Sequence, residues 1–149
     1  MKLRALLAGV EVLRSTANME MEIPSVVYDS RKVTPGCMFV AVSGFATDGN
    51  KYIPMAVEKG AAVVVTAKEL HAAVPCVQVA SDRRALAQIG ANYFGRPGDS
   101  MQLIGVTGTN GKTSSTLLLK HVLEQVLGAK VGLIGTMENL IGSEVVPTE

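Results

Sequence analysis

Short apolar runs rich in β-branched residues alternate with segments of helical periodicity along the first hundred residues. The stretch 52–60 places its apolar residues on one helical face, with Pro54 tolerated in the first turn and Gly60 positioned to end the helix. This alternation is typical of an α/β fold. Strands are predicted at residues 38–42, 61–66 and 76–80.

Two further helices are predicted in the same part of the chain. Residues 1–13 read as an amphipathic helix, and Glu11 interrupts their apolar run, so a cleaved signal segment is not indicated. Ser81 is a predicted N-cap for a helix whose apolar stripe includes Ile89 and Tyr93. No segment approaches the roughly 20 apolar residues that a bilayer span needs, so we expect a cytoplasmic protein without a membrane partner.

A linker is predicted at residues 95–100, which contain two glycines and a proline. We therefore place a domain boundary near Pro97, giving domains 1–97 and 98–149. Beyond the linker, residues 101–108 are predicted to form a strand that leads into a glycine-rich turn. A helix over Lys112–Leu127 and a second, parallel strand at residues 130–136 are expected to follow.

Composition narrows the possible partners. Hydrophobic residues make up 48% of the chain and charged residues 18%, an ordinary globular balance. A net charge of +1 and 4% aromatic residues argue against a nucleic-acid partner, which would require basic surface and stacking groups. Cys37 and Cys76 lack metal-ligand spacing and are expected to be buried thiols, whereas His71 and His121 are expected at the solvated surface.

The stretch "GVTGTNGKTSS" has the arrangement of a phosphate-binding loop between a strand and a helix. Gly108 and Gly111 would let backbone N–H groups approach an anion at the helix start. Lys112 would reach the β and γ phosphates of a nucleotide, and the Thr113 hydroxyl would ligate Mg²⁺. The general P-loop pattern requires glycine where Val106 stands. The alternative is a strand-to-helix turn with a surface lysine, in which the neighbouring polar residues only cap the helix and form the turn.

A second polar stretch, residues 29–53, surrounds the strand predicted at 38–42. Ser30 and Arg31 follow an apolar run, and a glycine-containing polar loop spans residues 43–50. Such loops at strand ends can hold a ligand. Physical reasoning leaves the alternative open, in which Asp29 and Arg31 form a surface ion pair and Asp48 begins an ordinary turn.

The pattern "DSRKV..G..FVAV.G...DG..YI", followed by "GVTGTNGKT", closely resembles the Mur ligases, the ATP-dependent amino-acid-adding enzymes of peptidoglycan and cell-wall synthesis. In that family the loop begins G-T-N-G-K-T, so Val106 is no defect. The segment "GLIGT....IGSEVVPTE" most resembles members that add the third residue, meso-diaminopimelate or L-lysine, to UDP-MurNAc-L-Ala-D-Glu. Two alternatives remain: the D-alanyl-D-alanine-adding Mur ligase, and a stand-alone nucleotide-binding module without ligase activity.

The resemblance implies a small α/β domain that binds the uridine nucleotide, followed by the start of a P-loop domain that binds ATP. It further implies activation of a substrate carboxylate as an acyl phosphate, which an amine then attacks, with ATP and Mg²⁺ required and Lys112 catalytic. The chain resembles the front part of such a ligase and is expected to be inactive by itself. The implied uridine contacts are Tyr28, Ser30, Phe45, Ala46 and Thr47. The implied ATP contacts are Gly108, Thr109, Asn110, Gly111, Lys112, Thr113 and Ser114, with Thr113 on the metal.

Overall fold

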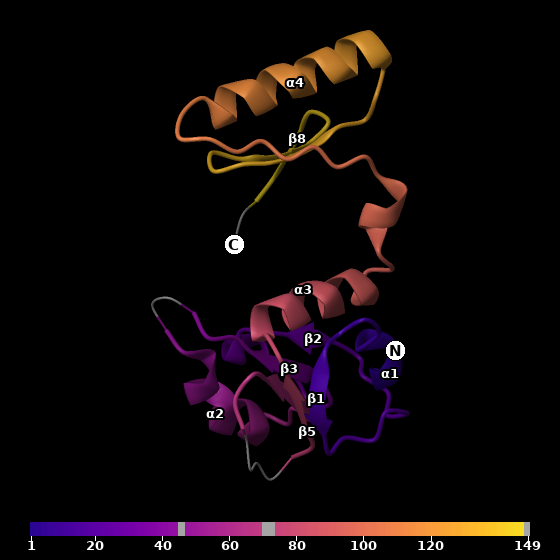
Figure 1. The fold of residues 1–149 in the computed structure, drawn as a ribbon, viewed down its shortest axis with the longest axis vertical. Helices are drawn as coiled ribbons and strands as arrows, with labels where there is room; N and C mark the ends of the chain where they lie inside the picture. The colour runs from indigo at the N-terminus through magenta and orange to yellow at the C-terminus, as the bar shows by residue number, and fades with distance from the viewer. Residues whose placement is uncertain (45–46, 70–73, 148–149) are drawn as a thin grey trace. The chain divides into compact units, whose positions relative to one another are not determined.

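The structure is a computed structural model that describes residues 1–44, 47–69 and 74–147. The chain divides into two compact units, Met1–Met101 and Gln102–Glu149, which Figure 1 shows in the colours of the sequence. Each unit is described by itself below. Within the described residues, no helix is long and apolar enough to cross a membrane.

The first unit contains a five-stranded sheet in the order β1-β5-β4-β3-β2. The four strands from β2 to β5 run parallel, and β1 pairs antiparallel with β5 at one edge. The predicted α/β fold and its three predicted strands are therefore confirmed. The strands are β1 (Val12–Ser15), β2 (Val26–Val27), β3 (Met38–Ala41), β4 (Val63–Thr66) and β5 (Cys76–Val79).

Helices cover both faces of this sheet, because successive strand residues point to opposite sides. Met38 and Val40 of β3 belong to a core cluster with residues of α1 (Leu3–Leu6) and α3 (Asp82–Tyr93). The alternate residue Phe39 belongs to a second cluster with residues of α2 (Ile53–Glu58). Three short 3₁₀ helices complete the unit: η1 (Ser30–Lys32), η2 (Gly49–Tyr52) and η3 (Pro97–Ser100).

The prediction of one amphipathic helix over residues 1–13 is wrong. The helix covers only Leu3–Leu6, and Gly9 then adopts a left-handed conformation with φ of 74°. A left-handed residue ends a helix, and the segment beyond it, β1, gains ladder hydrogen bonds by pairing with β5. Leu3 and Leu6 remain fully buried, so the apolar pattern reflects burial of a single turn followed by an edge strand.

The α3 helix begins as predicted. The Ser81 side chain accepts a hydrogen bond from the backbone N–H of Arg84 at 3.4 Å, and Ile89 is fully buried. The helix is followed by Gly95 and Arg96, both with positive φ, and then by η3.

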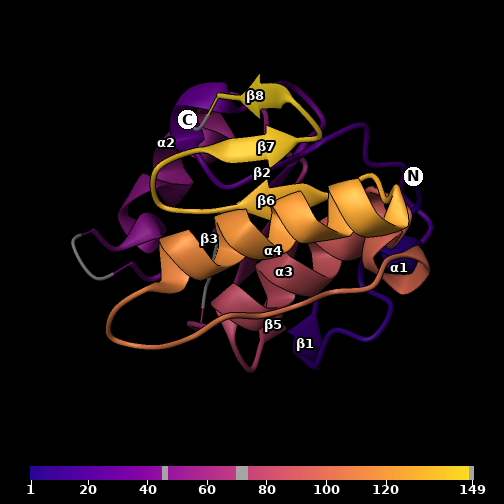
Figure 2. The same ribbon diagram turned by 90° about the horizontal axis from the view of Figure 1, so that it is seen from above.

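The second unit consists of α4 (Lys112–Leu127) and a three-stranded sheet, β6 (Gly132–Ile134), β7 (Asn139–Ile141) and β8 (Glu144–Val146). Figure 2 shows the three strands side by side along the helix. The predicted α4 helix is confirmed, and Gly128 caps it with φ of 60°.

The strand predictions for the second unit are largely wrong. Residues 102–107 form no strand, and β6 pairs antiparallel with β7 rather than in a parallel ladder. A strand requires a neighbour with which to share its backbone hydrogen bonds, and residues 102–107 have no such neighbour in the described part of the chain. Their side chains are therefore exposed, Leu103 to 78%. A short connection joins β6 to β7, and a connection of that length permits only antiparallel pairing of the two strands.

Candidate functional site

The predicted uridine contacts lie where parallel strands of the first unit end. Tyr28 and Ser30 follow β2, and the loop of residues 43–50 follows β3. In open α/β sheets, ligands bind outside the carboxyl ends of the strands. Tyr28 is 67% exposed and Thr47 is also exposed, whereas Ser30 is buried. Phe45 and Ala46, the other two predicted contacts, lie outside the described residues.

Ser30 is held in a tight turn by its two neighbours. The Asp29 carboxylate accepts hydrogen bonds from the Arg31 backbone N–H at 2.9 Å and from the Arg31 guanidinium at 2.7 Å. The Lys59 ammonium donates to the Ser30 carbonyl at 3.0 Å. The Ser30 hydroxyl itself has no hydrogen-bond partner among the described residues and is not sealed from solvent. The ion pair considered for Asp29 and Arg31 does form, and it leaves the intervening hydroxyl available.

We expect substitution of Arg31 by glutamine to raise the pKa of Asp29 from about 2 towards its ordinary 3.8. The hydrogen bonds from Arg31 are the main cause of the lowered pKa. Because the folded-state pKa is depressed, ionised Asp29 stabilises the fold above the ordinary carboxyl pKa, and this contribution is lost as pH falls towards 2. Carboxyl carbon NMR titration of Asp29 measures the shift.

Arg14→Gln is the control for that titration, since β1 and β2 form opposite edges of the sheet. An Asp29 midpoint that is unchanged in Arg31→Gln would show that another group holds the carboxylate.

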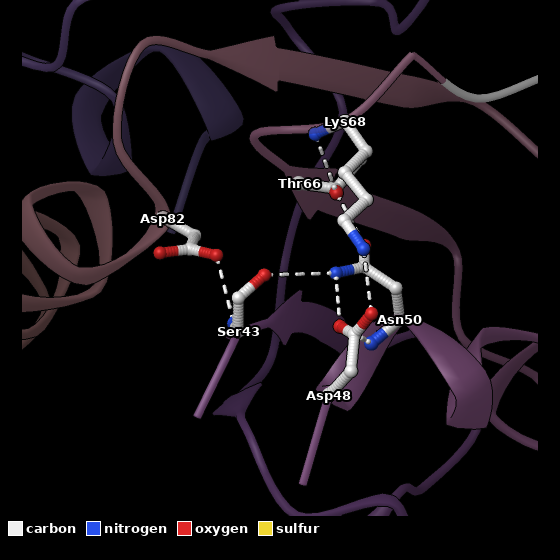
Figure 3. A network of polar contacts seen from close by, with 6 residues as sticks. All are labelled: Ser43, Asp48, Asn50, Thr66, Lys68 and Asp82. Atoms are coloured by element: carbon white, nitrogen blue, oxygen red, sulfur yellow. Dashed lines mark hydrogen bonds and ion pairs between the residues drawn. The ribbon is translucent and has the colours of Figure 1, made fainter. Parts of the chain in front are cut away.

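A network of polar side chains joins the ends of β3, β4 and β5 (Figure 3). The Ser43 backbone N–H donates to the Asp82 carboxylate at 2.8 Å. The Asn50 side-chain amide donates to the Ser43 hydroxyl at 3.3 Å and to Asp48 at 2.7 Å, and it accepts from Thr66 at 2.5 Å. The turn considered at Asp48 therefore exists, but it belongs to a larger assembly that holds Ser43 and Asn50 at the two ends of the loop.

Within this network, the Asp48 carboxylate forms an ion pair with the Lys68 ammonium at 2.5 Å. Hydrogen bonds from the Lys68 ammonium and from Asn50 hold the pKa of Asp48 well below its usual range. Sequence reasoning missed Thr66, Lys68 and Asp82. The usable signal was their position, because each ends or closely follows a predicted strand, where polar side chains of a parallel sheet converge.

The glycine-rich loop of the second unit leads directly into α4. Gly111 is left-handed with φ of 78°, and the Lys112 ammonium donates to the carbonyl oxygens of Gly108 at 2.5 Å and Thr109 at 3.4 Å. The first intrahelical bond runs from the Ser115 N–H to the Gly111 carbonyl. Within the described residues, the preceding backbone N–H groups have no backbone acceptor. They belong to Lys112, Thr113 and Ser114, all exposed.

This geometry fits a nucleotide phosphate. Unpaired N–H groups at the start of a 16-residue helix, with an ammonium beside them, attract an anion through both hydrogen bonding and the helix dipole. The described residues hold no group of three or more histidine, cysteine, aspartate or glutamate side chains that could bind a metal. Thr113, at the start of α4, remains the predicted ligand for a magnesium ion.

Family models match both units. One, described as the Mur ligase family catalytic domain, matches residues 22–94, and the other, the Mur ligase middle domain, matches residues 106–148. The chain belongs to the Mur ligase family. The resemblance carried by the "GTNGKT" loop and the "DSRKV" segment is thereby confirmed, and both of these Mur ligase motifs lie within the matched ranges.

Individual Mur ligases show how much of the family this chain represents. The UDP-N-acetylmuramoyl-L-alanyl-D-glutamate--2,6-diaminopimelate ligase of Alkaliphilus metalliredigens is 43% identical over 151 aligned residues, covering all of this chain and 30% of the relative. A solved structure of a ligase with that name aligns with 99% of the chain at a TM-score of 0.76 and 22% identity, covering 30% of its own chain. The MurF ligase of Thermotoga maritima, solved in complex with ADP, is 28% identical over 68% of this chain and 23% of its own, with a TM-score of 0.50.

The chain spans about 30% of the length of the curated relatives it matches. The similarity to the diaminopimelate ligases extends over the whole chain, whereas that to the MurF ligase of Thermotoga maritima covers only part of it.

Proposed function

We propose that this chain supplies the uridine-nucleotide site and the ATP loop of a ligase that adds 2,6-diaminopimelate to UDP-MurNAc-L-Ala-D-Glu. The observation that carries the proposal is the loop at the start of α4, where Lys112 bonds to the loop carbonyls and three backbone N–H groups have no backbone acceptor among the described residues. The reaction and the choice of amino acid rest on the names of relatives more than 40% identical over nearly the whole chain.

The proposed work is divided between the two units. Tyr28, Ser30 and Thr47, with Phe45 and Ala46, would contact the uridine nucleotide in the domain of residues 1–97. Lys112 would neutralise charge on the β and γ phosphates of ATP in the domain of residues 98–149, and Thr113 would orient a bound Mg²⁺. The remaining contacts to ATP would come from Gly108, Thr109, Asn110, Gly111 and Ser114.

The chemistry proposed is carboxylate activation. The γ-phosphoryl group passes from ATP to the substrate carboxylate, ADP leaves, and an amine of the diamino acid then displaces phosphate to form the amide. Mg²⁺ would supply charge neutralisation on the phosphate oxygens. The residues of this chain bind and orient the two nucleotides, which lowers the barrier by positioning the reactants.

A D-alanyl-D-alanine-adding activity is the second candidate, since a solved D-alanyl-D-alanyl ligase and a MurF ligase share the fold of this chain. The two activities differ in substrate: one takes UDP-MurNAc-dipeptide and a diamino acid, and the other takes the tripeptide and a dipeptide. An amide-forming assay on a full-length Mur ligase whose first 149 residues are those of this chain separates them. Ligation of D-alanyl-D-alanine in place of diaminopimelate would overturn the proposal.

Ser30→Ala is expected to weaken binding of UDP-MurNAc-L-Ala-D-Glu roughly three- to tenfold, because one neutral hydrogen bond is lost. ATP affinity should not change, since Ser30 and Lys112 belong to different units. Isothermal titration of each ligand measures both quantities.

Ser100→Ala provides the control, because that hydroxyl donates only to the carbonyl of Pro97. Equal weakening of both ligands by Ser30→Ala would contradict the separation of the two nucleotide sites.

A further inference from the structure

We propose that Asp82, Asn50 and Thr66 are positioning residues for the uridine-bearing substrate, acting by holding the two described ends of the loop that follows β3, residues 43–44 and 47–50. This inference rests on the proposed function, because the loop is assigned to the uridine site there. None of the three side chains is itself among the expected contacts. They act through the backbone of the loop that follows β3 (Figure 3).

Asp82 reaches across the end of a strand to hold the loop. It is the first residue of α3, directly after β5, and β4 lies between β5 and β3 in the sheet. Its carboxylate nevertheless accepts the Ser43 N–H at 2.8 Å, and the residue is 7% exposed. A buried carboxylate is costly unless it is hydrogen-bonded. The bond to Ser43 therefore ties the end of β3 to the start of α3.

Asn50 holds the other end of the loop, opposite Ser43. Both hydrogens of its amide group have acceptors, in Ser43 and Asp48, and its oxygen accepts from Thr66, which is 1% exposed. Because its amide hydrogens and its amide oxygen are all engaged, the Asn50 side chain is held in one orientation between the loop and the end of β4. A partly satisfied network would not have this rigidity.

The two ends of the loop are also bonded directly to each other. Ser43 and Asp48 form a β-bridge, and the Gly44 N–H donates to the Thr47 carbonyl at 2.9 Å. Gly49 packs against the residue that follows β3 so closely that a Cβ there would lie 2.5 Å from the carbonyl oxygen of Val42. The described part of the loop is thus held in one conformation from three strand ends, which reduces the ordering cost when a ligand binds.

The decisive variant is Thr66→Val. Valine has nearly the shape of threonine and suits a buried strand, so the chain should still fold, with a modestly lower melting temperature, because the hydroxyl that donates to Asn50 and accepts the Lys68 backbone N–H is lost. We expect UDP-MurNAc-L-Ala-D-Glu to bind the 149-residue chain about three- to tenfold more weakly, with ATP affinity unchanged. Amide hydrogen exchange at Ser43 and Asn50 should accelerate in the same variant.

Two substitutions of Asp82 form a matched pair. Asp82→Ala removes the acceptor of the Ser43 N–H and should weaken substrate binding by a similar factor. Asp82→Asn keeps an acceptor oxygen and should restore affinity to within about twofold of the wild type. Asp99→Ala, which removes a carboxylate paired only on the surface with Arg96, is the control.

The outcomes separate the two proposals. Wild-type chain that fails to bind the uridine substrate would overturn the proposed function, and this inference with it. Wild-type binding together with unchanged affinity in both Thr66→Val and Asp82→Ala would overturn only the positioning role. Weakened binding in Thr66→Val at a temperature where the variant is fully folded, with recovery in Asp82→Asn, would support it.

Discussion

Replacing Lys112 with alanine is expected to weaken ATP binding by roughly 10- to 100-fold, the range for one charge-assisted hydrogen bond to phosphate. Between residues 102 and 119, Lys112 is the only lysine or arginine in the sequence, so no neighbour along the loop can supply the charge. Its ammonium already lies over the loop, bonded to the carbonyl oxygens of Gly108 and Thr109.

Titration of ATP into a full-length Mur ligase that carries this chain at its start measures the effect. Lys130→Ala is the matched control, because Lys130 is an exposed lysine of the same unit beyond the end of α4. ATP affinity that is equal in Lys112→Ala and the wild type would show that the loop does not bind the nucleotide.

Amide hydrogens of β3 and β4 are expected to exchange at least about a thousandfold more slowly than those of α4 in the 149-residue chain. The central strands of the first unit are buried at every position. In residues 102–147, by contrast, Leu133 is the only buried side chain, and Val126 on α4 is 73% exposed. A helix that buries little apolar surface opens readily, because helix propensity alone barely stabilises 16 residues.

Exchange followed by mass spectrometry on peptides from each unit tests this difference. Protection of α4 equal to that of β3 would contradict it and would indicate that an apolar face of α4 is covered, for instance by self-association. Repeating the measurement across a range of chain concentrations distinguishes these cases, since association makes protection depend on concentration.

The elements that the sequence predicted well are those whose pattern is long or strongly apolar. α3 and α4 carry an apolar stripe over several turns, and the start of α3 is marked by an N-cap serine. The valine-rich strand β4 is buried at all four positions, which explains its uninterrupted apolar run. In these cases local pattern and tertiary burial agree.

The failures occur where tertiary pairing decides the local structure. Residues 1–13 have a helical pattern, but Gly9 ends the helix early and the last two residues, Val12 and Leu13, join the strand that pairs with β5. Residues 102–107 have a strand pattern without a pairing partner in the described chain. Neither the partner of an edge strand nor its absence can be read from a single segment.

The candidate site was predictable in its motifs and not in its supporting residues. The glycine loop was predicted from local residue types and spacing, whereas Ser30 was predicted only from the resemblance to the Mur ligases. Asp82 contacts a residue 39 positions earlier in the chain, and Thr66 contacts one 16 positions earlier. Only the sheet topology, with parallel strands ending at one edge, brings these side chains together.

The antiparallel strand β1 has a consequence for the order in which the chain folds during synthesis. Thr16, directly after β1, donates its backbone N–H to the carbonyl of Cys76, and these residues are 60 positions apart. At about 5–20 residues per second, a ribosome adds the intervening segment in roughly 3–12 s. β1 therefore leaves the ribosome before its partner β5, so the parallel strands can assemble before β1 closes their edge.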